Sequence, residues 1–299
     1  MSFQAQIRDV EDKDPEFVDS EFEMSRRDFK EIAATLHAES GIYIAESKTA
    51  LVYSRLAKRL RALGLASFRD YCNLIAGEDG REERQRMIAA LTTNVTAFFR
   101  EPHHFEHLKH NVAPQLIAAA QRGERVRLWS SACSSGEEPY SIALTLLSLA
   151  PNLANFDVKI LATDIDPNVV AVGERGLYSE RALAGAPANL RERWFRSARG
   201  ADGETLSAAD ELRRLVVFRQ LNLIGPWPMK GLFHAIFCRN VVIYFDQPTQ
   251  AKLWGRFASA LAPGGVLYIG HSERLSGPAV AAFRSEGVTT YRLSEGGRR

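Results

Sequence analysis

The spacing of hydrophobic residues changes at about residue 125. Before that point apolar residues recur at helical intervals, and no run alternates as a strand does. Within 47–63 four leucines show this spacing: Leu51, Leu56, Leu60 and Leu63. Ser25, with Asp28 three residues later, predicts a capped helix that runs to about His37. Gly64 predicts the end of the helix over 47–63.

After residue 125, short β-rich runs alternate with helical stretches. We predict strands at 125–129, 157–164, 215–218, 234–238, 266–270 and near 289–293, with helices at 137–149, 167–175 and 247–261. Such alternation favours an α/β fold, in which helices cover both faces of a mostly parallel sheet. The stretch 178–214 interrupts the alternation and contains a predicted loop at 199–204. We interpret this stretch as an insertion at the edge of the sheet.

Charge changes this picture only at the N-terminus. Residues 1–23 hold eight acids against Arg8 and Lys13, with few apolar anchors, which predicts a disordered acidic arm. A docking or autoinhibitory tail is the alternative. The whole chain of 299 residues has a net charge of +2, so its overall charge favours neither a nucleic-acid nor a membrane partner.

The cysteines and the apolar runs favour a cytoplasmic protein. Cys72, Cys133 and Cys238 are sparse and form no CxxC pair, which argues against a disulfide framework and against a zinc site. We see no secretory signal, and the longest apolar runs, such as 241–245, are too short to cross a bilayer. We therefore expect no membrane insertion.

The loop after the first predicted strand, 130–139 (SSACSSGEEP), is a candidate ligand site. Ligands of open α/β sheets bind at the carboxyl ends of the strands, and small residues let a ligand approach the backbone. The loop contains only Gly136 and lacks the GxGxxG pattern of dinucleotide sites. Glu137 could face a cationic ligand. Alternatively, Glu137 and Glu138 could simply complement the helix dipole.

Asp164 ends the second predicted strand. An acid at this position can accept hydrogen bonds from both hydroxyls of a ribose. Asp166 is followed by Pro167, a pattern typical of a helix N-cap. We therefore assign ribose binding to Asp164 and capping to Asp166.

Four histidines, His103, His104, His107 and His110, lie close together in sequence. Some have the i,i+3 or i,i+4 spacing that can bind a metal on a helix, but no acid or cysteine evidently completes a site. We interpret them as a partly exposed helix face and predict no metal.

Four further segments occur in a characteristic order: 91–101 (LTTNVTAFFRE), 134–141 (SSGEEPYS), 238–245 (CRNVVIYF) and 261–265 (LAPGG). Over about residues 24–293 the chain resembles the CheR family, the glutamate methyltransferases of bacterial chemotaxis receptors. The first and third segments are specific to this family. The resemblance implies a Rossmann-like sheet that binds S-adenosyl-L-methionine (SAM), a small all-α N-terminal domain and a small β insertion.

We expect the chain to divide into four parts. After the acidic arm over 1–23, which charge predicts, the resemblance implies a helical receptor-docking domain over 24–95, a linker with a helix over 96–124, and the SAM-binding domain over 125–299 with its insertion at about 178–214. It implies methyl-accepting receptor helices as partners and S-adenosyl-L-homocysteine (SAH) as the product. The insertion contains few glycines, which argues against a grip on a receptor tethering peptide.

The resemblance also implies roles for single residues. The lid over the cofactor would be Asn94, Thr96 and Arg100, with Arg100 near the reacting carboxylate. Ser131 and Glu137 would contact the methionine part, Asp164 the ribose, and Asn222 with Leu223 the adenine. Beside the methyl group would lie Arg239, Asn240 and Tyr244. We expect Phe98 and Phe99 to be core residues.

The expected chemistry requires no general base. Glutamate is ionised at neutral pH, since its ordinary pKa is about 4.3, and transfer of a methyl group from a sulfonium is an in-line displacement. We expect Arg100 to orient the carboxylate and Tyr244 to add a hydrogen bond. Two rival hypotheses are a methyltransferase that acts on another protein or on nitrogen and a SAM-sensing module without turnover. The absence of prolines in 239–242 argues against a nitrogen acceptor.

The helix over 47–63 carries basic residues and no acid. Lys48, Arg55 and Arg59 share one helical face, and Lys58 adjoins it. A solvated basic face is one interpretation. With the family resemblance, we expect instead that these four residues dock the glutamate-rich receptor helices.

Overall fold

The computed structural model describes residues 21–200 and 203–294. They form two compact units. The first comprises the chain to Glu39 together with Ile44–Leu91, and the second comprises Ser40–Tyr43 and the chain from Thr92 onward. A short piece of the N-terminal region therefore belongs to the second unit.

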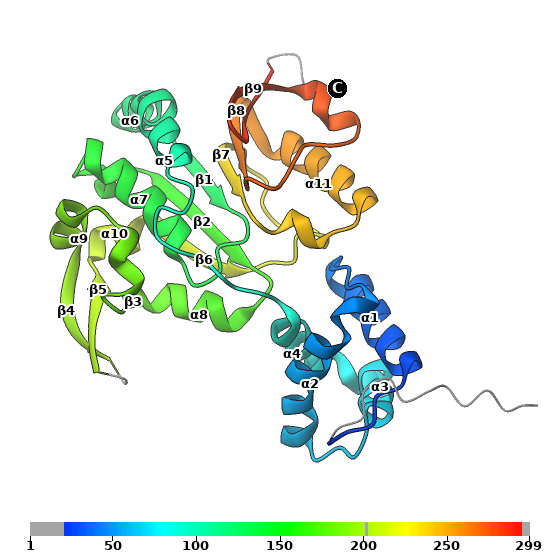
Figure 1. Cartoon of the computed structure of the whole chain (residues 1–299). Helices are drawn as coiled ribbons and strands as arrows, with labels where there is room; N and C mark the ends of the chain where they lie inside the picture. The colour runs from blue at the N-terminus through cyan, green and yellow to red at the C-terminus, as the bar shows by residue number, and fades with distance from the viewer. Residues whose placement is uncertain (1–20, 201–202, 295–299) are drawn as a thin grey trace, which may run out of the picture. The chain divides into compact units, whose positions relative to one another are not determined.

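The first unit is helical, as predicted. Its helices are α1 (Arg26–Ser40), α2 (Thr49–Leu63), α3 (Phe68–Ala76) and α4 (Arg81–Leu91) (Figure 1). Ser25 Oγ accepts from the backbone N–H of Asp28 over 3.2 Å, which confirms the predicted cap, and Asp28 Oδ2 accepts in return from the N–H of Ser25. Helix α1 runs three residues past His37. Gly64 ends α2 with φ of 66°, as the sequence indicates.

The described end of the acidic arm is ordered by contacts. Residues 1–20 lie outside the described part of the chain. Phe22, however, is buried, and its N–H donates to Tyr53 Oη over 3.0 Å. Glu21 forms an ion pair with Arg61. The prediction of disorder is therefore wrong for residues 21–23.

A seven-stranded sheet organises the second unit, in the order β6-β2-β1-β7-β8-β10-β9. The parallel strands are β1 (Val126–Ser130), β2 (Val158–Asp164), β6 (Val216–Gln220), β7 (Phe233–Cys238) and β8 (Leu261–Ile269). Two antiparallel strands, β10 (Thr290–Leu293) and β9 (Phe283–Gly287), complete one edge. The prediction missed β9 and placed the start of β8 five residues late.

Successive residues of a strand point to opposite faces of the sheet, and each face packs into its own hydrophobic core. On β1, Leu128 joins the core formed with α7 (Glu137–Leu149) and α6 (Ala113–Gln121), whereas Trp129 joins the core under α11 (Gln247–Ala260). Figure 1 shows α11 and α7 flanking the strands. The predicted helices at 137–149 and 167–175 are confirmed as α7 and α8 (Pro167–Arg175).

The segment 96–124, expected to be a linker with a helix, is part of the core of the second unit. It forms α5 (His103–His107), a π-helical turn (Leu108–Val112) and α6, and it buries Phe105, Leu108 and Leu116. The edge insertion contains α9 (Ala188–Trp194), α10 (Asp210–Leu215) and a small sheet of β3 (Leu177–Tyr178), β5 (Gly203–Ala208) and β4 (Phe195–Gly200). Strands β4 and β5 extend into the predicted loop at 199–204.

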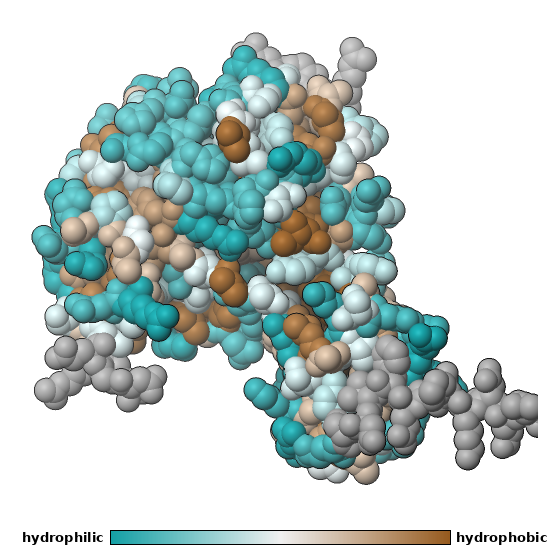
Figure 2. Space-filling view, viewed as in Figure 1, coloured by the Kyte–Doolittle hydropathy of each residue, from teal (hydrophilic) through white to brown (hydrophobic). Residues whose placement is uncertain are grey.

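The visible surface is largely hydrophilic, and its hydrophobic areas are small and separate (Figure 2). Exposed apolar side chains include Tyr43, Val95 and Ile243. Among the described residues, no helix combines the length and the apolar character that a membrane crossing requires.

Candidate active site

The site residues gather where the parallel strands end. Strands β1, β2 and β7 end at Ser130, Asp164 and Cys238, and half of the predicted cofactor residues lie at these ends or in the segments that follow them. This edge is where open α/β sheets bind ligands.

The loop between β1 and α7 is largely buried and tightly held. Ser131 donates its backbone N–H (2.8 Å) and its hydroxyl (3.0 Å) to the carbonyl of Phe237 in β7. Gly136 has φ of 99°, and a Cβ there would lie 2.7 Å from the hydroxyl of Tyr178. The small residue at position 136 therefore permits packing against the insertion, whereas the sequence had suggested room for a ligand.

Asp164 is buried with both carboxylate oxygens fixed. One oxygen accepts from the N–H of Ser134 over 2.8 Å, and the other from the N–H of Asp166 over 3.1 Å. Burial raises the pKa of the Asp164 carboxyl, against the effect of these hydrogen bonds. Each oxygen keeps a second lone pair, so the carboxylate can still accept a hydroxyl donor.

Asp166 caps α8, as predicted, by accepting from the N–H of Asn168 over 2.9 Å. Its other oxygen accepts from Asn94 Nδ2 over 2.9 Å. The carbonyl of Asn94 in turn accepts the hydroxyl of Ser134. The first residue of the predicted lid is thus connected to the loops after β1 and β2.

Arg239 lies buried between two carboxylates. Its Nη1 donates to Glu138 Oε2 over 3.0 Å, and its Nη2 is 3.3 Å from Glu101 Oε2. Nη2 also donates to the carbonyl of Arg100. The guanidinium therefore anchors the backbone of the predicted lid. Burial raises the pKa of Glu138, and the charge of Arg239 opposes that effect.

Glu101 connects the lid segment to two strand ends. Its Oε1 accepts from Asn240 Nδ2 (3.2 Å) and is 2.9 Å from His271 Nδ1. Burial opposes ionisation, but the hydrogen bond from His271 and the charge of Arg239 prevail and lower the pKa of Glu101 to about 2. Phe99 and Glu101 both have positive φ, 53° and 58°. Such backbone strain in non-glycine residues is typical of functional segments.

Glu273 holds the loop after β7. Its Oε2 accepts the N–H groups of Asn240 (3.1 Å) and Gly270 (2.6 Å). Its Oε1 accepts those of Val241 (2.9 Å) and Val242 (2.7 Å). Asn240 has φ of 57°, and a Cβ on Gly270 would lie 2.5 Å from the side-chain nitrogen Nδ2 of Asn240. The 239–242 loop is therefore shaped by one buried carboxylate.

Tyr244 follows this loop and is half-buried. Its carbonyl accepts from the N–H of Tyr43 over 2.8 Å, next to an antiparallel bridge between Ile42 and Phe245. The backbone of the predicted catalytic tyrosine is thus held by Ser40–Tyr43.

The predicted adenine residues follow β6. Asn222 Oδ1 accepts from the N–H of Ile224, and Leu223 is buried in the core under α11. The N–H of Leu221 donates to the carbonyl of Asp164 over 2.8 Å, so this segment starts beside the predicted ribose residue.

Arg100 and Thr96 are half-buried, and Arg100 Nη1 donates to the carbonyl of Val95 over 2.8 Å.

Phe98 is a core residue, as predicted, with edge-on contacts to Tyr178 and Phe195 of the insertion. Phe99 is partly buried against the same core.

One of the four histidines differs from the predicted, partly exposed helix face: His103 and His110 are exposed and His107 is half-buried. His104 is fully buried, and its Nε2 lies 2.9 Å from Thr289 Oγ1. Burial, together with the charge of Arg239, lowers its pKa to about 3. Glu101, His103 and His104 place ligand atoms within 4.8 Å of one another, so an acid does stand near the histidines. Arg239 already pairs with that acid, and the absence of a metal stays a prediction.

The predicted docking residues lie in the first unit, and two of them have internal partners. Arg59 forms a bidentate ion pair with Glu83 (2.9 and 2.6 Å), and Arg55 donates to the carbonyl of Leu91 over 2.9 Å. Both therefore tie α2 to α4. Lys48 and Lys58 are exposed. The docking role of all four stays a prediction.

Sequence reasoning missed Glu101, Glu138 and Glu273 as site residues. Their partners lie 139, 101 and 33 residues away along the chain. The only local signal was the position of Glu138 at a helix start.

The donor and acceptor set fits SAM. Buried Asp164 retains acceptor capacity for hydroxyls. Glu137, buried in the first turn of α7 with Ser135 as its hydrogen-bond partner, supplies a negative charge for a cationic ligand. Burial raises the pKa of Glu137, and a nearby cation would favour its ionised form.

Comparison with known proteins shows the family to which the chain belongs. Residues 94–292 match the SAM binding domain of CheR methyltransferases, and residues 27–92 match their all-alpha domain. A probable chemotaxis protein methyltransferase of Rhizobium etli is 52% identical over 88% of this chain and 98% of its own length. Chemotaxis protein methyltransferase 2 of Pseudomonas aeruginosa is 45% identical over 93% and 96%.

The chemotaxis protein methyltransferase of Escherichia coli is 40% identical over 91% of this chain and 92% of its own length. The fold and site define a SAM-dependent methyltransferase. The chain belongs to the CheR methyltransferase family.

Proposed function

We propose that this protein transfers a methyl group from SAM to glutamate side-chain carboxylates of chemotaxis receptors. The observation that carries the proposal is the setting of Arg100: a half-buried cation on a strained segment whose backbone is held by Arg239 and Glu101. A cation suits a carboxylate acceptor, because charge-assisted hydrogen bonds can orient it, whereas hydrogen-bond acceptors suit a neutral nitrogen acceptor.

Several residues would hold SAM, which supplies an electrophilic methyl group when bound. Asp164 would accept the ribose hydroxyls, Ser131 and Glu137 would contact the methionine part, and Asn222 with Leu223 would contact the adenine. Asn94 and Thr96 would belong to the lid. These roles follow from the family resemblance and from the positions of the residues at the carboxyl edge of the sheet.

Orientation and the exclusion of water account for the catalysis that we propose. The acceptor glutamate is already ionised at neutral pH, so no side chain needs to remove a proton. Arg100 would align the carboxylate with part of its guanidinium, leaving a lone pair free to attack. Tyr244, fixed through its backbone to Tyr43, would add a hydrogen bond. A dry site strengthens both contacts.

The test is methylation of receptor-containing membranes with labelled SAM, followed by mild base. We expect label that base releases as methanol, because carboxyl methyl esters hydrolyse and N-methyl groups do not. Base-stable label would indicate a nitrogen acceptor. SAM binding without any label transfer would indicate a sensing module. A cytoplasmic location for the reaction stays a prediction.

A further inference from the structure

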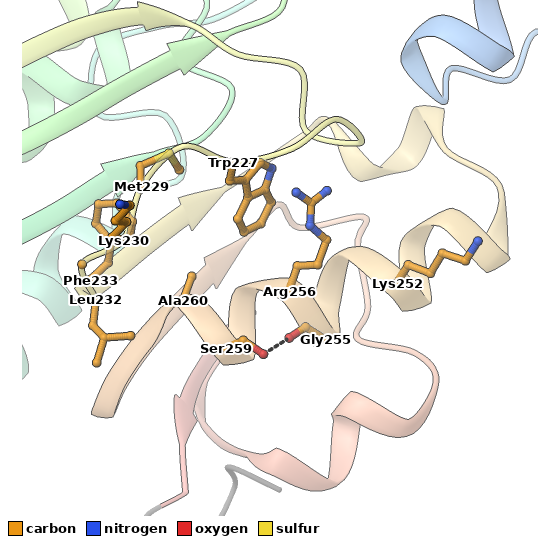
Figure 3. Close-up of a pocket in the computed structure, with 11 residues that line it drawn as sticks. Trp227, Met229, Lys230, Leu232, Phe233, Lys252, Gly255, Arg256, Ser259 and Ala260 are labelled. Atoms are coloured by element: carbon orange, nitrogen blue, oxygen red, sulfur yellow. Dashed lines mark hydrogen bonds between the residues drawn. The ribbon is translucent and has the colours of Figure 1, made fainter.

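A groove of about 680 Å³ lies along α11 in the second unit. One wall is the 227–233 segment that leads into β7, and the other is a face of α11 (Figure 3). We call it the α11 groove. None of the site residues described above lines it, so its chemistry needs a separate account.

The lining of the α11 groove is basic and apolar. Of the described residues that line it, Lys230, Lys252 and Arg256 are basic and none is acidic. Both lysines are exposed, and among the residues that the structure describes neither has an ion-pair partner. Apolar contact surface comes from Met229 and from Leu232, which is 37% exposed. A ligand that suits this lining is negatively charged and carries an apolar group.

Arg256 is a fixed wall of the groove. Its Nη1 and Nη2 donate to the carbonyls of Leu223 (2.5 Å) and Gly225 (2.6 Å). Its guanidinium lies 3.9 Å from the centre of the Trp227 ring. Because these contacts occupy Arg256, the two lysines are the cations that can move to meet a partner.

The groove is long compared with a single anion. On α11 it is lined by Lys252, Arg256 and Ala260, which share one helical face and span about 12 Å along the axis. Figure 3 shows Lys230 and Lys252 at opposite ends, with Trp227 between them. One phosphate or one carboxylate cannot reach both ends. A peptide segment with acids about two helical turns apart can do so, with an apolar side chain between them.

We propose that the α11 groove is a second docking surface for the acceptor protein and binds a carboxylate-rich segment of it. This inference rests on the proposed function, which makes the acceptor a protein that bears glutamates. Lys252 lies about 9 Å along the helix axis from the N-cap Asp246. Asp246 is two residues after Tyr244. An acceptor with its target glutamate near Tyr244 therefore reaches the start of the groove.

The test uses the full-length protein with K230E and K252E combined. A matched control carries K109E and R175E, which changes the net charge equally at basic residues of the same unit outside the groove. Arg256 is left intact because it holds the carbonyl of Leu223. Initial methylation rates are measured against the concentration of receptor-containing vesicles at two ionic strengths. Sedimentation of each protein with the same vesicles measures binding without turnover.

For the groove variant we expect the acceptor KM to rise about tenfold at low ionic strength, while kcat stays within about twofold. High salt should reduce the difference in acceptor KM between the groove variant and the unmodified protein. The affinity for SAH should not change. An equal rise in KM for the control, or vesicle binding as strong as the unmodified protein's, would overturn the inference. If the unmodified protein forms no methyl ester, the proposed function fails, and the sedimentation comparison still decides whether the groove binds the acceptor.

Discussion

Replacing Glu273 by glutamine should destabilise the fold and slow methyl transfer. Each Glu273 oxygen accepts two backbone N–H groups. In the glutamine variant an NH2 group takes the place of one oxygen, so two of the four backbone donors lose their acceptor and face another donor. Hydrogen bonds to charged groups contribute about 1.5–3 kcal/mol each. Burial of the carboxyl raises the pKa of Glu273, so the charged form is costly to bury. The glutamine side chain is neutral and avoids this cost, which offsets part of the loss.

We therefore expect a loss of about 3 kcal/mol in the free energy of unfolding, measured by urea denaturation at pH 7. Turnover should fall at saturating acceptor, because the 239–242 loop leads directly to Tyr244. Glu106→Gln is the matched control, since Glu106 is exposed and contacts His110 one helical turn later. A Glu273→Gln protein that unfolds within about 0.5 kcal/mol of the original and turns over normally would refute this reasoning.

Four further predictions test other residues. Asp164→Ala should weaken both SAM and SAH in calorimetry; unchanged affinity removes it from the site. Arg100→Ala should lower kcat and kcat/KM together while SAH binding persists; normal turnover with saturating receptor contradicts its role. The pKa of His104 is about 3 in the folded chain and near 6.5 when unfolded, so the unfolded state binds the proton first and stability falls as pH drops from 6.5 toward 3. His104→Asn should reduce the loss of unfolding free energy between pH 7 and pH 5, measured by urea denaturation. An equal loss in the variant and in the original protein would contradict this prediction. Lys48→Glu with Lys58→Glu should slow receptor methylation at low salt and leave SAH binding intact; rates equal to the original's contradict docking through α2.

The elements that the sequence predicted well are those with local causes. The Ser25–Asp28 cap, the glycine that ends α2 and the Asp166 cap of α8 each depend on residues within a few positions. The order of strands and helices after residue 125 likewise follows from local hydrophobic spacing. Strand β9 was missed because its residues are mostly exposed and do not alternate clearly.

The candidate site was only partly predictable, because its buried charges depend on long-range contacts. Nothing near Glu273 in sequence distinguishes it from a surface glutamate, yet it accepts four backbone hydrogen bonds. His104 was expected on a partly exposed face, but β10 and the turn before it bring Thr289 against its ring from 185 residues away. The spacing of Arg55 and Arg59 places them on one basic helical face, which is why a docking role was predicted. Their partners on α4 become evident only in the folded structure.

Locating the transferred methyl group tests the central claim most directly. A purified receptor is incubated with SAM and the protein, digested, and its peptides are fragmented in a mass spectrometer. We predict a methyl group on glutamate side chains, lost after mild base and absent when the Arg100→Ala variant replaces the original protein. A base-stable methyl group on a side-chain nitrogen would contradict the account.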